Sequence, residues 1–158
     1  MIKNSVLNTL SERFFPLKNF NGNFKDPDFL RLKQYLNDIA AELSELFPEE
    51  KYYAKAYTGN GRMPLVPWVG LHSKKEDFNS KPETGLYLTL LWQADGSGFC
   101  LSFQKGSDKS SKKQLSRAVE LIGENYDLSE FDFSINLKAP PKSKRPENYQ
   151  NAHIAGYT

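Results

Sequence analysis

The first third of the chain carries hydrophobic residues at helical spacing. A stripe that repeats every four residues predicts a short amphipathic helix before Pro16, formed by Ile2, Val6, Leu10 and Phe14. A longer helix is predicted up to Pro48, with Asp26 as its N-cap and Pro27 at its first position. Its hydrophobic stripe, at spacings of three and four, consists of Phe29, Leu32, Leu36, Ile39, Leu43 and Leu46. We expect both stripes to face a hydrophobic core.

From residue 52 the pattern changes to the alternation that is typical of strands. In the first such segment, 52–57, one face carries Tyr53, Lys55 and Tyr57. Apolar runs between polar loops predict further strands at 65–71, 85–92 and 98–104. A last strand is predicted at 131–137, where phenylalanine and aliphatic residues alternate with polar ones.

The remaining segments complete an α+β pattern. Ser110 or Ser111 can cap a third helix, whose apolar face consists of Leu115, Ala118, Val119, Ile122 and Tyr126. Residues 138–146 have the composition of an extended, basic and proline-rich linker, and a short helix is predicted from Glu147 toward Gly156. We therefore expect a single domain over residues 1–158, in which helices flank a curved, mixed sheet of about five to six strands.

Positive charge is concentrated in the second half of the chain. The formal net charge of the 158 residues is only +2, but one basic cluster comprises Lys105, Lys109, Lys112, Lys113 and Arg117. Residues 138–145 form a second cluster with no acidic residue in it. Such clusters are often solvated surface, yet two of them in one half of the chain favour a polyanionic partner.

The sequence contains no recognisable catalytic set. Cys100 lies in an apolar run, and neither His72 nor His153 has a neighbouring acid that could orient it. Asp28 and Glu49 imitate the spaced acids of a metal-dependent nuclease, but the predicted helix between them holds them about 30 Å apart. No apolar stretch is long enough to span a membrane, and no signal peptide is recognisable. We expect a cytoplasmic binding domain without cofactor or metal.

Aromatic residues in the central strands are candidates for ligand contacts. Trp68, Tyr87 and Trp92 suit a core, but rings gathered around a pocket also stack on a nucleic-acid base, which contributes about 1–3 kcal/mol per base. The sequence Gly-Asn-Gly-Arg at 59–62 predicts a hairpin tip. Such a tip can enter a DNA groove and fill the space left by a displaced base.

Several short motifs occur in the order and spacing of a known family. They are Gly59-x-Gly61, Val66-Pro67-Trp68-Val69, Gly85-Leu86-Tyr87, Leu101-Ser102-Phe103-Gln104-Lys105-Gly106 and Tyr149-x-x-Ala152-His153-Ile154. Through them the region of residues 50–157 resembles the N-terminal domain of McrB-like restriction proteins. The resemblance implies a DNA-binding specificity module of a modification-dependent restriction system for phage defence. It also implies that a nuclease or NTPase acts from another domain or subunit.

The resemblance assigns roles to individual residues. Trp68, Tyr87 and Leu91 would line a pocket for a flipped base. Asn60 and Arg62 would probe the groove, with Asn60 in place of the aromatic residue that a methylcytosine reader carries at this tip. The expected partner is double-stranded DNA that contains a modified cytosine, such as methylcytosine, or a specific site.

Phosphate contacts are expected from basic residues, namely Lys105, Lys109, Lys112, Lys113 and Lys144. Two other functions fit the same aromatic and basic residues. A reader of RNA or single-stranded nucleic acid would stack bases without flipping them. A protein-interaction or oligomerisation module would bury the same rings in a dry interface.

Overall fold

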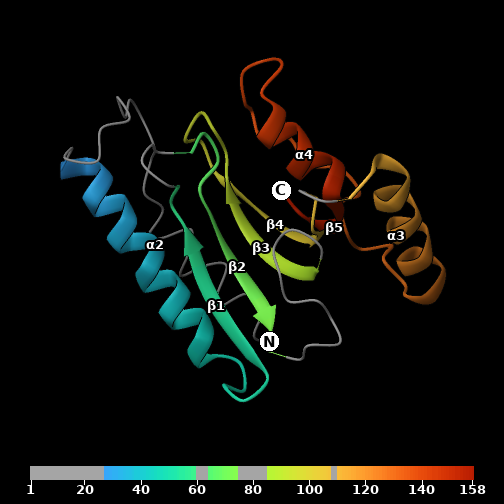
Figure 1. Cartoon of the computed structure of the whole chain (residues 1–158), viewed down its shortest axis with the longest axis horizontal. Helices are drawn as coiled ribbons and strands as arrows, with labels where there is room; N and C mark the ends of the chain where they lie inside the picture. The colour runs from blue at the N-terminus through green and yellow to red at the C-terminus, as the bar shows by residue number, and fades with distance from the viewer. Residues whose placement is uncertain (1–26, 60–63, 75–84, 108–109) are drawn as a thin grey trace.

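An antiparallel sheet forms the centre of the molecule (Figure 1). The computed structural model describes residues 27–59, 64–74, 85–107 and 110–158, in which five strands follow the order β1-β2-β3-β4-β5. The strands are β1 (Tyr52–Tyr57), β2 (Trp68–Ser73), β3 (Leu86–Trp92), β4 (Phe99–Lys105) and β5 (His153–Tyr157). The predicted α+β class and strand number are confirmed. The sheet is antiparallel rather than mixed, because each of β2 to β5 pairs antiparallel with the strand before it.

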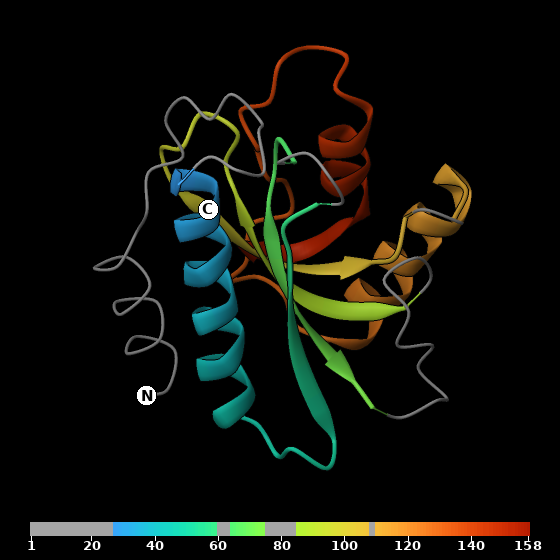
Figure 2. The same cartoon turned by 60° about the vertical axis from the view of Figure 1, so that its left-hand side comes forward.

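Helices lie on both sides of this sheet (Figure 2). In the described part of the chain they are α2 (Pro27–Glu45), α3 (Lys112–Asn125) and α4 (Lys144–Ala152). Helix α2 runs beside β1 and β2, whereas α3 and α4 lie near β4 and β5. None of these helices is long and apolar enough to cross a bilayer.

Helix α2 covers one face of the sheet with the predicted stripe. Leu32 and Leu36 are fully buried in a core cluster with Val69, Leu90 and Trp92 of the sheet. The prediction of this helix is confirmed for the stripe from Phe29 to Leu43, whereas Leu46 lies beyond the helix end at Glu45 and is 49% exposed. The predicted N-cap, Asp26, lies outside the described residues. The shorter helix predicted before Pro16 lies outside the described residues.

Helix α3 begins with a capping box. The Ser111 side chain accepts a hydrogen bond from the Gln114 backbone N–H at 3.3 Å, and the Gln114 side chain accepts one from the Ser111 N–H at 2.8 Å. These bonds satisfy two backbone donors that the helix itself leaves without partners. The predicted cap is therefore confirmed at Ser111. It fixes the lysines that follow at the N-terminal end of α3.

The strand predicted at 131–137 is wrong. In this extended segment Asp132 and Gly156 form an isolated antiparallel bridge, and the Leu137 carbonyl accepts from the Ala94 N–H at 2.8 Å. The segment leaves β5 after the bridge and crosses toward the β3–β4 hairpin. The alternation of apolar and polar residues in 131–137 gave a wrong prediction because only the second half of the segment is buried. Ile135 and Leu137 enter the core, whereas Phe133 remains 60% exposed.

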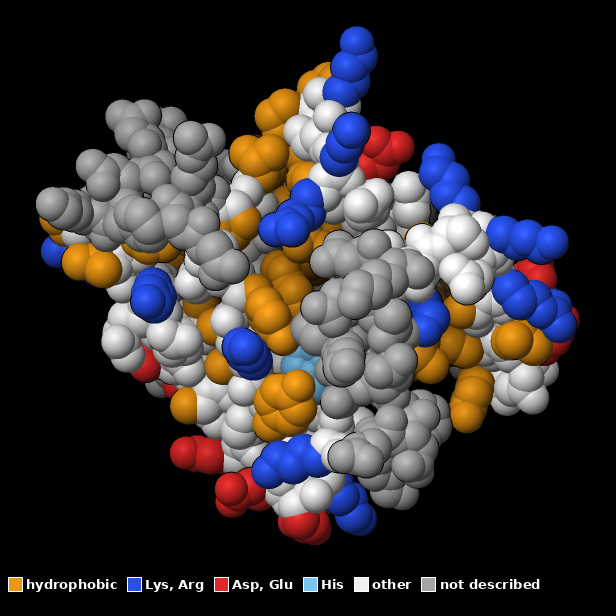
Figure 3. Space-filling model, in the orientation of Figure 1, with side chains coloured by type: hydrophobic (Ala, Val, Ile, Leu, Met, Phe, Trp, Pro, Cys, Tyr) orange, Lys and Arg blue, Asp and Glu red, His pale blue; other side chains and the backbone are white. Residues whose placement is uncertain are grey.

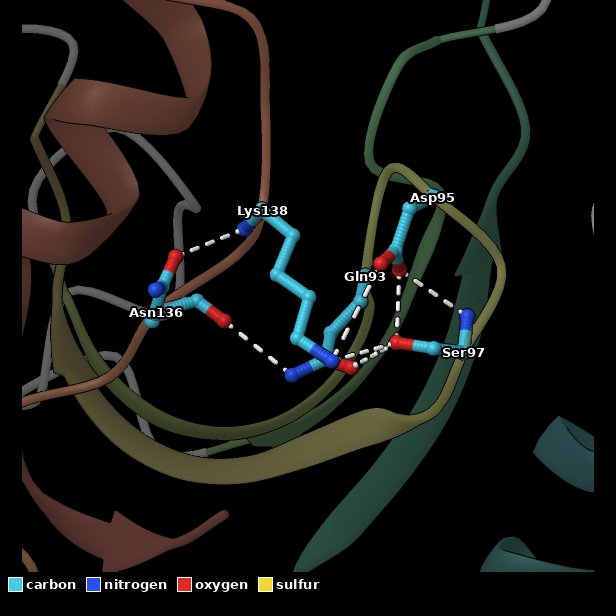
Figure 4. A network of polar contacts seen from close by, with 5 residues as sticks. All are labelled: Gln93, Asp95, Ser97, Asn136 and Lys138. Atoms are coloured by element: carbon cyan, nitrogen blue, oxygen red, sulfur yellow. Dashed lines mark hydrogen bonds and ion pairs between the residues drawn. The ribbon is translucent and has the colours of Figure 1, made fainter.

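A polar network fastens this segment to the β3–β4 hairpin (Figure 4). The Gln93 amide donates to the Asn136 carbonyl at 3.1 Å, and the Lys138 ammonium contacts Ser97 and, at 3.8 Å, Asp95. Hydrogen bonds from Ser97 lower the pKa of the Asp95 carboxyl, and Lys138 adds to the effect. Lys138 has a positive φ of 48° and is held at its backbone N–H by the Asn136 side chain. Its ammonium is therefore engaged within the protein.

The C-terminal region differs from the prediction in two places. Helix α4 begins at Lys144, so the last three residues of the predicted linker 138–146 form its first turn. The predicted continuation of this helix to Gly156 is wrong, because His153–Tyr157 form β5 instead. This strand pairs with β4, including Ser102 opposite Gly156, and it extends the sheet beyond β4.

Candidate nucleic-acid interface

The sheet face opposite to α2 carries an aromatic cluster. Alternation along β1 and β2 places Tyr53, Tyr57, Trp68 and His72 on this face, and β3 adds Tyr87. The register explains the grouping, since Tyr57 lies opposite Trp68 and Tyr53 lies opposite His72. We call these five residues the aromatic cluster.

Tyr57 and Trp68 form the tightest ring contact of the cluster. Their ring centroids are 3.7 Å apart and their planes differ by 10°, so the rings are nearly face to face. Trp68 is 7% exposed, whereas Tyr57 is half-buried. Tyr57 therefore covers the Trp68 ring on the side nearer to solvent.

A glycine makes room for this packing. Gly70 lies between Trp68 and His72 on β2, and their side chains lean over it. A Cβ atom at Gly70 would lie 2.5 Å from His72 Nε2 and 2.7 Å from Trp68 Cζ3. Only glycine fits the arrangement without movement of one of the two rings.

Helix α4 holds the Trp68 ring of the cluster in place through a hydrogen bond. The Trp68 indole N–H donates to the Tyr149 hydroxyl at 3.1 Å, and the Tyr149 carbonyl accepts from the Gln104 amide at 3.0 Å. Tyr87 and Leu91 are 5% and 0% exposed in the same core cluster as Trp68. The three residues predicted to form the base pocket thus lie together and are buried.

His72 is the polar residue in the middle of the rings. It is fully buried, with its Nε2 atom 3.2 Å from the Tyr57 hydroxyl, and its Nδ1 atom has no hydrogen-bond partner among the described residues. Burial, together with a smaller contribution from the positive charge of Lys55, lowers the pKa of His72 to about 4. At neutral pH the imidazole is therefore uncharged, with one donor and one acceptor nitrogen.

This lowered pKa predicts a loss of stability in acid. Between pH 6.5 and about 4 the unfolded chain protonates His72 and the folded chain does not, so the free energy of unfolding falls as the pH falls through this window. The full shift corresponds to about 3 kcal/mol. We expect urea denaturation at pH 7.5 and 4.5 to show a smaller loss for His72→Leu than for the wild type. Equal losses in both proteins would contradict the assignment.

The second histidine belongs to a satisfied structural network. His153 Nε2 lies 3.0 Å from the Asp132 carbonyl, which can only accept, so this nitrogen carries the proton. Burial lowers the pKa of His153, and its Nδ1 atom accepts from the Ser102 hydroxyl at 2.7 Å. Cys100 is a buried core residue, and no group of three or more histidine, cysteine or acidic residues in the described ranges suits a metal ion.

Exposed basic residues surround this side of the molecule. In Figure 3 Lys and Arg side chains stand over α4 and the segment before it, over α3, and also over α2 and β1, with hydrophobic side chains gathered between them. Lys112 and Lys113 are exposed in the first turn of α3, and Lys144 is exposed at the start of α4. Lys105 is half-buried at the end of β4, where it lies opposite Leu86 on the α2 side of the sheet, and Lys109 lies outside the described residues.

A cavity among the described residues lies on the other face. Its volume is about 800 Å³, and it is lined mainly by apolar residues, among them Tyr52, Leu86, Phe103, Ile122, Tyr126 and Phe131. Leu86 and Phe103 alternate with Tyr87 and Gln104 along their strands, so the cavity is on the α2 side of the sheet. The predicted pocket residues do not line it.

The sequence identified only part of this site. It missed Tyr57, His72 and Tyr149, although alternation along β1 had already placed Tyr57 beside Lys55 on one face. Lys55 is exposed, with its ammonium 5.4 Å from the centroid of the Tyr57 ring. It is a cation of the site that lies outside both basic clusters. The predicted groove probes, Asn60 and Arg62, lie outside the described residues.

Comparisons with known proteins place this fold in a family. The family model described as "MrcB-like, N-terminal domain" matches residues 15–158, which is most of the chain. No curated protein and no solved structure matches the chain. The match includes every strand of the sheet and the aromatic cluster. The chain belongs to the family of MrcB-like N-terminal domains.

Proposed function

We propose that the chain is the DNA-binding specificity domain of a McrB-like restriction system. It recognises a modified cytosine or a specific site in double-stranded DNA by receiving a flipped base among Trp68, Tyr87 and Leu91. The observation that carries the proposal is the family match over residues 15–158. The domain binds and does not catalyse, and cleavage depends on a nuclease or NTPase domain or subunit.

The aromatic cluster supports the base-binding part of the proposal. Flipping a base requires a few kcal/mol for unstacking and unpairing, and each aromatic stack returns about 1–3 kcal/mol. Trp68 and Tyr87 offer two rings at a centroid distance of 5.9 Å with planes only 21° apart. Because Trp68 is held by Tyr149, its ring is already oriented before DNA binds.

The basic residues support binding to the DNA backbone. Lys112 and Lys113 occupy the end of α3 where the helix dipole is positive, and the described first turn contains no acidic residue to compensate it. A phosphate placed there meets two ammonium groups and the positive end of the helix. Lys105, Lys109 and Lys144 extend the proposed phosphate contacts.

A salt titration with charge variants tests the proposal. We expect a labelled duplex to bind at low salt, with an affinity that falls steeply as salt increases. The double variant Lys112→Gln/Lys113→Gln should reduce the slope of log K against log salt by about two, equally for all sequences. A matched double variant on α2, Arg31→Gln/Lys33→Gln, should leave the slope unchanged, because α2 packs against β1 and β2, whereas α3 lies near β5 and α4.

The ligands in this titration separate the alternatives. Duplexes with cytosine, methylcytosine and hydroxymethylcytosine test which base is read, and a single strand of the same sequence tests the reader of unpaired nucleic acid. Equal and negligible binding to all of them at low salt would refute the proposal.

The apolar cavity favours a second candidate function, a protein-binding surface. Next to its lining residues, Leu121 is 43% exposed, and Tyr126 in the lining is 67% exposed. Association through such a surface is driven by apolar burial and depends little on salt. Sedimentation at low and high salt distinguishes it from the salt-dependent binding of DNA.

A further inference from the structure

The contact between Tyr57 and Trp68 suggests how the proposed base site is filled in the free protein. We propose that the Tyr57 ring occupies the place on Trp68 that a DNA base takes in the complex, and that Tyr57 and the base compete for His72. This inference rests on the proposed function and adds to it a competing residue and a polar contact for the base.

The geometry of the ring pair makes Tyr57 the exchangeable member. Two phenyl-like rings that lie face to face are less favourable than offset or edge-on pairs, because their quadrupoles repel. The pair is close to this arrangement, at 3.7 Å and 10°. Trp68 is buried and anchored at its indole N–H, whereas Tyr57 is half-buried at the last position of β1. A flat ligand can therefore replace Tyr57 without disturbing Trp68.

The position of Tyr57 in the chain allows it to move. β1 ends at Tyr57, and Gly59 follows with a positive φ of 85°. The Tyr57–Trp68 pair is also the last of the β1–β2 register. A rotation of this residue therefore leaves the pairing of the rest of β1 intact. Lys55 lies two positions earlier on the same face. Its ammonium group can then contact the phosphate of an incoming nucleotide.

His72 gives the site a hydrogen-bonding group. The Tyr57 hydroxyl lies 3.2 Å from its Nε2 atom, and its buried Nδ1 atom has no partner among the described residues. A buried nitrogen without a partner is unfavourable, and a ligand that supplies one removes this penalty. The edge of a base carries neighbouring donors and acceptors, so it can replace the tyrosine hydroxyl at the neutral imidazole.

The competition lowers the apparent affinity of the wild type. When the site is mostly closed by Tyr57, the apparent dissociation constant exceeds the intrinsic one by the inverse of the open fraction. Tyr57→Phe keeps the ring but removes the hydrogen bond to His72, so it weakens the closed state alone. We expect this variant to bind duplex DNA about two- to tenfold more tightly than the wild type.

Fluorescence anisotropy with a labelled duplex at low salt measures this effect. Tyr52→Phe is the matched control, because Tyr52 lies on the same strand with its side chain on the α2 side of the sheet, and the change removes only a hydroxyl. It should leave the affinity unchanged. In a His72→Leu background, where phosphate contacts keep binding measurable, Tyr57→Phe should give no gain.

Two results would overturn the inference while leaving the proposed function intact. One is that the wild type binds the duplex and the Tyr57→Phe variant binds it equally well or more weakly. The other is a gain from Tyr57→Phe that persists in the His72→Leu background. If the wild type does not bind duplex DNA at all, the proposed function fails and the inference fails with it.

Discussion

Replacing Trp92 with alanine is expected to lower the free energy of unfolding by about 3–5 kcal/mol. Trp92 is fully buried under α2, with its ring 6.0 Å from Tyr35 and 5.8 Å from Phe99, centroid to centroid. Its removal leaves a large cavity between the helix and the sheet. Because domains of this size are stable by only about 5–15 kcal/mol, the variant should be close to unfolding at 25 °C.

Urea denaturation followed by far-UV circular dichroism measures the loss. Trp92→Phe is the informative control, since the Trp92 indole N–H is buried and has no hydrogen-bond partner among the described residues. Phenylalanine removes this donor and retains most of the ring, so we expect a loss below about 1.5 kcal/mol. A loss below about 1 kcal/mol for Trp92→Ala would contradict the assignment of Trp92 to the core under α2.

Gly156→Ala is expected to lower the free energy of unfolding by about 3 kcal/mol. Gly156 lies in β5 opposite Ser102, and its backbone also exchanges hydrogen bonds of 2.9 and 3.0 Å with Asp132. A Cβ atom there would lie 2.0 Å from the Leu101 carbonyl oxygen. The obstacle is backbone, so the β4–β5 pairing must shift.

The same substitution at Gly123 provides a control with the opposite sign. Gly123 lies in α3, and a Cβ atom there would meet nothing within 4 Å. Alanine in a helix is favoured over glycine by about 0.5–1 kcal/mol, so Gly123→Ala should stabilise the protein. Thermal or urea unfolding of the two variants should therefore move in opposite directions from the wild type. A Gly156→Ala variant as stable as the wild type would contradict the described β4–β5 pairing.

Local signals explain which elements could be predicted from the sequence. The α2 stripe and the Ser111 capping box are encoded within a few residues of one another, and both are confirmed. By contrast, the extended segment 131–137 and strand β5 each depend on contacts with residues far away in the sequence. Phe131 to Leu137 alternates like a strand, but Gly156 and Ala94 determine where its backbone pairs. Alanine and glycine in β5 give that strand little signal of its own.

The aromatic cluster shows the same limit. Trp68, Tyr87 and Leu91 could be grouped from their motifs, and the structure places them together in one core cluster. The ring that covers Trp68 depends on the register that places Tyr57 opposite Trp68, which the sequence of neither strand specifies. The anchor on the indole N–H comes from Tyr149, more than eighty residues later in the chain.

The two tryptophans lie on opposite faces of the sheet, which allows a direct test of the proposed base site. In the variant Trp92→Phe, Trp68 is the only tryptophan of the chain, so intrinsic fluorescence reports on the aromatic cluster alone. A control titration with dextran sulfate separates a general polyanion effect from base binding.

Titration of this variant with duplex DNA tests the central claim most directly. If a base enters the cluster, Trp68 emission changes on stacking, with the same midpoint as the anisotropy of the labelled duplex, and dextran sulfate does not reproduce the change. Saturable binding of the duplex with unchanged Trp68 emission would contradict a base site at Trp68, and it would leave only binding through the basic surface.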